Sequence, residues 1–159
     1  MLVKGIQVED FVNYKECSMF ISMGTCDWKC CIEGGFDKSI CQNEPIAKLP
    51  DTNISNDKII QWFMNNPLSK ALVIGGLEPF TYFSELLEFI KLFRSKSNAI
   101  IVIYTGYREN EVEEEIKLLQ EYKNIIVKFG RFELGHEPHY DDVLGVNLAS
   151  DNQYGKRIS

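Results

Sequence analysis

Residues 99–104 read Ala99-Ile100-Ile101-Val102-Ile103-Tyr104 and form the longest apolar run of the chain. Most of these side chains are β-branched, which favours extended backbone, and no charged residue interrupts them. A run of this kind predicts a strand that is buried on both faces of its sheet. It is far too short to cross a bilayer, because a membrane helix needs about 20 apolar residues.

Segments on both sides of this run alternate between strand and helix patterns. The alternation implies an α/β fold with a mainly parallel sheet and right-handed crossovers, in a single domain over residues 1–159. The predicted strands are Ser18–Gly24, Ala71–Ile74, Ala99–Tyr104 and Ile125–Val127. The predicted helices cover about residues 55–65, 81–94 and 110–122.

The composition argues against several classes of partner. The chain has 159 residues and a net charge of −6, so its charge does not favour nucleic acid binding. It contains no basic run that would hold an anionic membrane surface. Met1–Gly5 lacks the apolar region of a signal peptide, so we expect a cytoplasmic protein with no nucleic acid and no membrane partner. Thiols stay reduced in that compartment.

Cysteines cluster directly after the first predicted strand. Four of the five lie between Cys26 and Cys41, in a loop over about residues 25–43 that has no clear period and is predicted to be irregular. The odd count and the clustering favour metal or redox chemistry over disulfides. Cys26 and Cys30 form a C-x₃-C pair without the second pair that zinc ribbons prefer. Three thiolates without a fourth ligand suit a [4Fe–4S] cubane with one open iron, and inert buried thiols are the alternative.

Three features follow predicted strands: the cysteine loop, Gly75–Pro79 and Tyr104–Tyr107. Ligands of parallel α/β sheets bind at the C-terminal ends of the strands, so we expect the three to meet in space. Gly75 and Gly76 lack a Cβ, which would let the backbone approach a ligand or would serve a tight turn. Glu78 could accept an ammonium group, or it could begin the next helix as a favourable acid.

The cysteine loop resembles that of the radical S-adenosylmethionine enzymes, most of all the small activating proteins of anaerobic ribonucleoside-triphosphate reductase. The usual family spacing is C-x₃-C-x₂-C, and in the activating proteins the third cysteine opens Cys-His-Asn-Pro, to which Cys41-Gln42-Asn43-Glu44-Pro45 is similar. Glu33 stands where the usual third ligand would be, so the spacing here is C-x₃-C-x₁₀-C. Cys31 competes with Cys41 as third ligand. The resemblance implies that the cluster ligands are Cys26, Cys30 and Cys41.

Other segments resemble the same proteins in the expected order. Gly75-Gly76-Leu77-Glu78-Pro79 resembles the Gly-Gly-Glu-Pro segment that receives the methionine amino group of S-adenosylmethionine, with Leu77 as an extra residue. The remaining similar segments are Asp10–Tyr14, Tyr104–Tyr107, Gly130–Phe132 and Ser150–Gln153 with Arg157. The resemblance thus spans nearly the whole chain. It implies that the residues binding S-adenosylmethionine are Gly75, Gly76, Glu78 and Thr105.

The resemblance also implies a fold and an activity. The fold would be a partial (β/α) barrel. The activity would be that of an oxidoreductase that generates a 5′-deoxyadenosyl radical and installs a glycyl radical on anaerobic ribonucleotide reductase. That large glycyl-radical enzyme would be the partner, together with an electron donor such as flavodoxin or ferredoxin. The alternatives are a radical enzyme acting on another peptide or small molecule, and a non-catalytic iron–sulfur or zinc module.

We predict surface or structural roles for the remaining histidines, for Cys17 and for an acidic run. His136 and His139 flank Pro138, which disfavours a helix, so we expect a surface loop rather than a metal pair. Cys17 precedes the first strand, at the end opposite the cysteine loop, and is predicted to be structural. An acidic run is expected to form a solvated helix face, and it comprises Glu109, Glu111, Glu113, Glu114 and Glu115.

Overall fold

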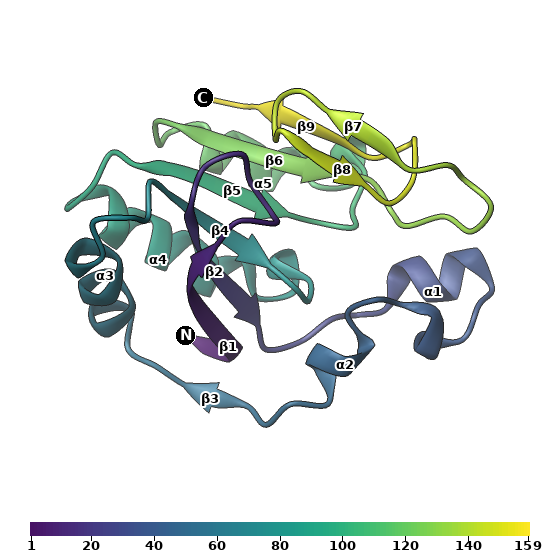
Figure 1. Cartoon of the computed structure of the whole chain (residues 1–159), viewed down its shortest axis with the longest axis horizontal. Helices are drawn as coiled ribbons and strands as arrows, with labels where there is room; N and C mark the ends of the chain where they lie inside the picture. The colour runs from purple at the N-terminus through teal and green to yellow at the C-terminus, as the bar shows by residue number, and fades with distance from the viewer.

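A seven-stranded mixed sheet runs through the middle of the molecule (Figure 1). The computed structural model describes residues 1–159 and gives the strand order β3-β1-β2-β4-β5-β6-β9. The strands of the sheet are β1 (Leu2–Asp10), β2 (Ser18–Met23), β3 (Thr52–Asn53), β4 (Ala71–Gly75), β5 (Ile100–Tyr104), β6 (Ile125–Phe129) and β9 (Tyr154–Arg157). A separate antiparallel hairpin pairs β7 (His139–Asp141) with β8 (Val146–Leu148).

The centre and the flanks of the sheet differ in strand direction. β2, β4, β5 and β6 are parallel, and their register places Ile74 beside Ile103, which stands beside Val127. These four strands lie where the apolar runs predict them, because both faces of the centre are buried. β1, β3 and β9 pair antiparallel, which the mainly parallel prediction did not include. The sheet is open at β3 and β9, and the partial barrel stays a prediction.

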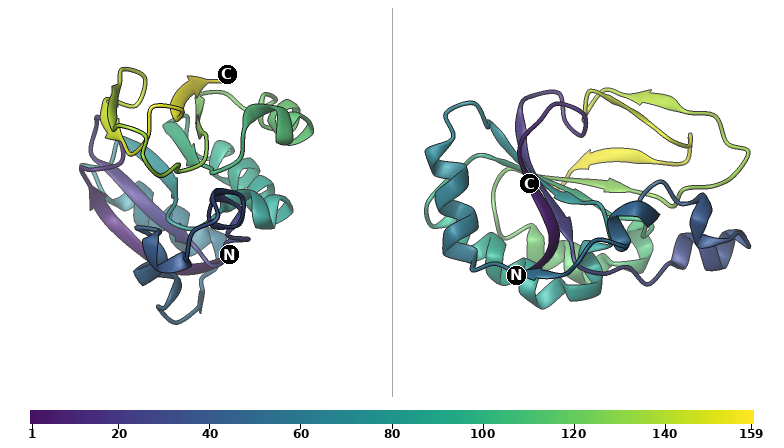
Figure 2. Two further views of the ribbon diagram at one scale, coloured as in Figure 1. Left: turned by 90° about the vertical axis from the view of Figure 1, so that its right-hand side faces the viewer. Right: turned by 60° about the horizontal axis from the view of Figure 1, so that its bottom comes forward.

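Three helices cover one face of the sheet (Figure 2, left). They are α3 (Asn56–Asn65), α4 (Phe83–Arg94) and α5 (Glu113–Leu119), and 3₁₀ turns precede α4 (η2, Pro79–Tyr82) and α5 (η3, Glu109–Glu111). Their apolar faces and one face of the strands form the main core, which includes Phe63, Phe89 and Phe93. None of the helices combines the length and the apolar character that a bilayer crossing demands.

The other face of the sheet carries a smaller core under the β7–β8 hairpin. Tyr14, Leu144 and Leu148 are buried there against alternate residues of the central strands, among them Val73 and Val102. The hairpin lies across the sheet from α4 and α5 (Figure 2, left). This face of the sheet, the inner face, is therefore packed with side chains under the hairpin.

The segment after β2 lies on the side to which the arrowheads of β4, β5 and β6 point (Figure 1). It contains α1 (Lys29–Gly34), a 3₁₀ turn η1 (Lys38–Ile40) and α2 (Glu44–Ala47). The prediction of a wholly irregular loop is therefore wrong. No period was visible because Cys31 is the only buried residue of these three elements. Gly35, with φ 64°, ends α1 in the left-handed conformation that glycine adopts readily.

Candidate functional site

A cavity of about 450 Å³ lies at the C-terminal ends of the central strands. Its wall includes residues that follow β2, β4, β5 and β6, so the three predicted features do meet. Four cysteines reach it: Cys26, Cys30, Cys31 and Cys41. Of the residues predicted to bind S-adenosylmethionine, the wall includes Gly76, Glu78 and Thr105 but not Gly75. Its size is typical of small-molecule sites.

The carboxylate of Glu78 ties the strand ends together. Its Oε1 accepts hydrogen bonds from the Thr105 hydroxyl at 2.7 Å and from the Phe80 amide at 3.1 Å, and its Oε2 accepts one from the Gly106 amide at 2.8 Å. The Glu78 amide donates to Thr25 O at the start of the cysteine loop, at 2.9 Å. Glu78 is 6% exposed, and burial raises its pKa to about 7, against the opposing effect of these hydrogen bonds.

Thr105 and Gly106 form the turn that follows β5. The Thr105 hydroxyl donates to Glu78 and accepts from the Tyr107 amide at 3.0 Å, so its role in this structure is to brace the turn. A Cβ added to Gly106 would stand 2.8 Å from Cys30 Sγ. The turn therefore approaches the thiol as closely as a side-chain-free residue allows. Gly106 was not predicted as a site residue, because a glycine after a strand usually marks only a turn.

Gly75 and Gly76 are explained by packing in the structure. A Cβ on Gly75 would lie 2.8 Å from Cβ of Tyr104 on the neighbouring strand. Gly76 adopts φ 73°, and a Cβ there would meet the side chain of Ser22 at 3.0 Å. Gly76 thus satisfies the alternative of a tight turn and also contributes to the cavity wall, whereas Gly75 allows close packing of β4 against β5.

The cysteines surround the cavity without converging on one point. Burial raises the pKa of Cys26 to about 12, although its sulfur accepts the Trp28 amide at 3.3 Å. Burial also raises the pKa of Cys30, against the backbone amide of Phe132 and the charge of Lys128. A bound metal cation would lower the pKa of such thiols and so deprotonate them. No three Cys, His, Asp or Glu side chains form a group that could hold one metal ion. Several thiols around a shared space fit a multi-atom cluster as the occupant.

Lys128 is a site residue that the sequence analysis missed. It lies near the end of β6, is 7% exposed, and contributes to the cavity wall. Its Nζ donates one hydrogen bond, to Gly130 O at 2.9 Å. Burial lowers its pKa to about 8, while Cys30 and Glu78 nearby favour the charged form. The available signal was a lone lysine inside a strand of five residues that are otherwise apolar.

Other predictions have mixed outcomes. Cys17 does not reach the cavity. His136 Nε2 lies 3.2 Å from Glu133 Oε2. His139, predicted to lie in a surface loop, is instead the first residue of β7, and its Nε2 lies 2.7 Å from Gln153 O. Of the run predicted as a solvated helix face, Glu109 and Glu111 lie in the η3 turn before α5 and form ion pairs, Glu109 with Lys156 and Glu111 with Arg131.

One of three comparisons with known proteins found a match. A family model described as a 4Fe-4S single cluster domain matches residues 14–153, which include every cysteine and every wall residue of the cavity except Val12 and Asn13. No curated protein matches the chain, and no solved structure matches it. The matched region covers most of the chain. The chain therefore belongs to the family of 4Fe-4S single cluster domains.

Proposed function

We propose that this protein is a radical S-adenosylmethionine enzyme that installs a glycyl radical on anaerobic ribonucleotide reductase. Cys26, Cys30 and Cys41 hold the [4Fe–4S] cluster in this proposal, and S-adenosylmethionine occupies the same cavity. The sheet then corresponds to a partial (β/α) barrel of a cytoplasmic enzyme. The partners are the large reductase and an electron donor such as flavodoxin or ferredoxin.

One observation carries the proposal: the cavity combines thiols with two charged side chains of opposite sign. Glu78 and Lys128 are the only acidic or basic residues of its wall. A zwitterionic amino acid group, such as the methionine end of S-adenosylmethionine, offers an ammonium to the acid and a carboxylate to the base. Glu78 accepts three hydrogen bonds from the chain, and a carboxylate has about four acceptor sites, so one remains for a ligand.

When bound, the reduced cluster would supply one electron that breaks the sulfonium carbon–sulfur bond of S-adenosylmethionine, giving methionine and a 5′-deoxyadenosyl radical. This radical would take a hydrogen atom from a glycine of the reductase. The chain's own residues bind and orient the amino acid end through Glu78 and Lys128. The apolar part of the wall, which includes Phe20, Leu77 and Leu148, excludes water from the reacting centre.

Cys31 favours a second candidate function, that of an electron-carrying cluster protein without enzymatic activity. Its thiol lines the same cavity, and burial, together with the nearby Cys41 and Cys30, raises its pKa. A cluster bound by four thiolates has no open iron for a substrate. The two functions therefore differ in how many of the cysteines are ligands.

Electron paramagnetic resonance on the anaerobically reconstituted, reduced protein tests the proposal. We expect a [4Fe–4S]⁺ signal that changes when S-adenosylmethionine is added, and release of 5′-deoxyadenosine in the presence of a reductant. S-adenosylhomocysteine is the matched control ligand, because it lacks the sulfonium bond that is cleaved. A cluster signal that is identical with and without S-adenosylmethionine would overturn the enzyme and leave the electron carrier.

Single Cys→Ser variants at positions 26, 30, 31 and 41 assign the ligands in the same experiment. Under the proposed function, the variants at positions 26, 30 and 41 lose the cluster, and Cys31→Ser keeps both the cluster and its response to S-adenosylmethionine. Under the second function, all four variants lose a native cluster signal. Cys17→Ser serves as the control, because Cys17 lies outside the cavity.

A further inference from the structure

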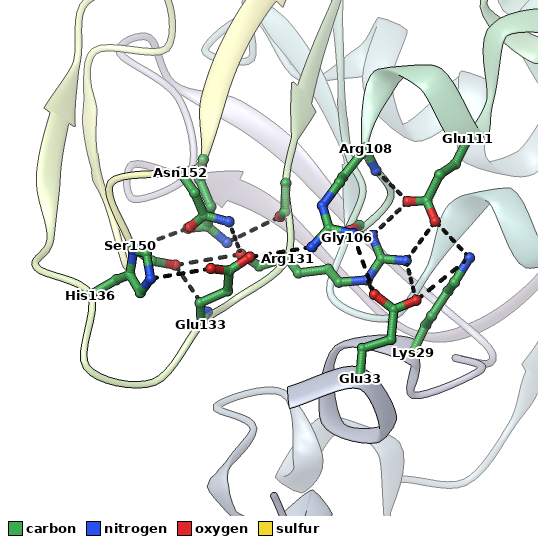
Figure 3. A network of polar contacts seen from close by, with 12 residues as sticks. Lys29, Glu33, Gly106, Arg108, Glu111, Arg131, Glu133, His136, Ser150 and Asn152 are labelled. Atoms are coloured by element: carbon green, nitrogen blue, oxygen red, sulfur yellow. Dashed lines mark hydrogen bonds and ion pairs between the residues drawn. The ribbon is translucent and has the colours of Figure 1, made fainter. Parts of the chain in front are cut away.

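We propose that Arg131 is a positioning residue for the cluster, which acts by clamping helix α1 to the strand ends through Glu33 and Glu111. α1 carries Cys30 and Cys31, and Arg131 follows β6 and Gly130. The side chains of Arg131, Glu33 and Glu111 point toward one another (Figure 3). The proposal rests on cluster binding by this family and not on the radical chemistry.

The guanidinium of Arg131 lies between two carboxylates. Its Nη2 donates to Glu33 Oε1 at 2.9 Å and to Glu111 Oε1 at 2.8 Å. Its Nη1 donates to Glu111 Oε2, and its Nε lies 2.9 Å from Glu33 Oε2 without hydrogen-bond geometry. The planar fork of arginine matches a carboxylate on two sides, which a lysine cannot do. Arg131 thus connects α1 to the η3 turn.

The burial of Arg131 separates this clamp from ordinary surface ion pairs. Its side chain is 2% exposed, whereas Glu33 and Glu111 are 38% and 22% exposed. Exposed pairs contribute little, but a buried charge that loses its partner is strongly unfavourable. Lys29, also on α1, adds a second link to Glu111 at 2.8 Å (Figure 3). Glu111 of η3 is thus linked to α1 twice, directly through Lys29 and by way of Arg131 to Glu33.

The clamp sits next to the cluster site itself. Arg131 Nη1 donates to Gly106 O at 3.5 Å, and Gly106 belongs to the turn in which an added Cβ would stand 2.8 Å from Cys30 Sγ. α1 buries only Cys31, so apolar packing contributes little to its position. Glu33 does not line the cavity and turns to Arg131 instead. The Glu33 side chain therefore anchors α1 through its ion pair with Arg131.

The test compares Arg131→Met, Arg131→Lys and Glu33→Gln with the wild type. Glu44→Gln is the matched control, because it breaks the Glu44–Lys48 pair of α2 in the same segment but outside the clamp. The first measurement is the rate at which a chelator removes iron from the reconstituted protein. The second is hydrogen exchange of residues 29–34 in the metal-free protein, which reports the position of α1 without any cluster.

We expect chelator removal to become roughly tenfold faster in Arg131→Met, the size of effect typical of losing a group that orients metal ligands. Arg131→Lys should recover only part of this loss, and Glu33→Gln should show a smaller increase in rate. Exchange of residues 29–34 should accelerate in all three variants while exchange in β4 and β5 stays unchanged. Adding Glu33→Gln to Arg131→Met should have a smaller effect than Glu33→Gln alone, because the Glu33–Arg131 pair is already lost and Glu33 keeps only its longer pairs with Arg108 and Lys29.

The proposal is overturned if Glu33→Gln behaves like Glu44→Gln in both measurements. Glu33→Gln carries the test alone if Arg131→Met does not fold, because Glu33 is partly exposed. Neither measurement uses S-adenosylmethionine. A wild-type cluster signal that ignores S-adenosylmethionine would therefore overturn the proposed function and leave the clamp standing.

Discussion

Glu78 is a buried carboxyl whose protonation should be visible in the pH dependence of stability. Its pKa is about 7 in the folded chain, against 4.5 for an exposed glutamate. Between these two values the folded state holds a proton that the unfolded state has released, so stability falls as the pH rises from about 4.5 to 7. The shift corresponds to roughly 3 kcal/mol. Urea unfolding of the metal-free protein at a series of pH values measures the effect.

Glu78→Gln isolates this contribution because glutamine does not titrate. We expect the wild type to lose stability relative to the variant as the pH rises from about 4.5 to 7. Above pH 7 the difference between their unfolding free energies should be constant. Parallel pH profiles for the two proteins would contradict a raised pKa. A ligand ammonium at Glu78 would reverse the effect, since a positive charge favours the ionised carboxylate.

Gly106→Ala tests the close approach of the β5 turn to Cys30. The new Cβ would lie 2.8 Å from Cys30 Sγ, so either the turn or α1 must move. The backbone conformation of Gly106 is ordinary, and the substitution therefore probes space rather than strain. We expect a lower iron content after reconstitution and little change in the thermal unfolding of the metal-free protein. Gly5→Ala is the control, because nothing lies within 4 Å of its added Cβ.

Lys128→Met tests the single basic group of the cavity wall. Methionine keeps the apolar stem and removes the charge, so we expect the cluster to form normally. The affinity for S-adenosylmethionine, measured by titrating the cluster signal, should fall by roughly tenfold or more, as for a lost charged hydrogen bond. Lys156→Met, an exposed lysine of β9, should bind like the wild type. Unchanged affinity in Lys128→Met would remove this residue from the proposed site.

Some residues of the site could be predicted from the sequence, and others could not. Cysteine spacing and the segment after β4 are local signals, and they led to Cys26, Cys30, Cys41 and Glu78. Gly106 and Arg131 become notable only through distant neighbours, because Gly106 approaches Cys30 and Arg131 meets Glu33 across 98 positions of the chain. No local pattern carries that information.

Among the elements, the β7–β8 hairpin contributes a part of the core that the alternation of strands and helices does not predict. Leu144, between the two strands, is fully buried against the inner face of the sheet. Leu144→Ala should lower the unfolding free energy by about 3 kcal/mol, through lost burial and the cavity left behind. Leu118→Ala, on the exposed side of α5, should cost less than about 1 kcal/mol. Equal effects would mean that the hairpin does not pack on the sheet in solution.

Elements with strong periodicity were predictable, and elements defined by pairing were not. The helix predicted over about residues 55–65 is α3, and the one over about 81–94 is η2 followed by α4. β1 was missed because most of its residues are exposed or half-buried and it contains Gly5. β7, β8 and β9 are three or four residues long, and their partners rather than their own side chains define them.

At the scale of the whole molecule, the sheet and the cysteine segment depend on different forces. The sheet is held by a large apolar core whose members are mostly inaccessible to solvent. α1, η1 and α2 bury one residue between them. α2 packs on the core only through the partly buried Ile46 and Ala47, and α1 is held by the ion pairs of Lys29 and Glu33. Regions with few buried contacts open at low free energy. Cluster binding should therefore stabilise the cysteine segment far more than the sheet.

Hydrogen exchange with and without the reconstituted cluster tests this division. We expect slower exchange over about residues 25–51 in the loaded protein and unchanged exchange in β4, β5 and β6. Chelation of the iron should restore fast exchange without unfolding the sheet, because most of the apolar core lies away from the cavity and packs without the cluster. The Cys26→Ser/Cys30→Ser variant, treated in the same way, should show no difference. Loss of protection throughout the sheet on chelation would instead mean that the cluster is required for the fold.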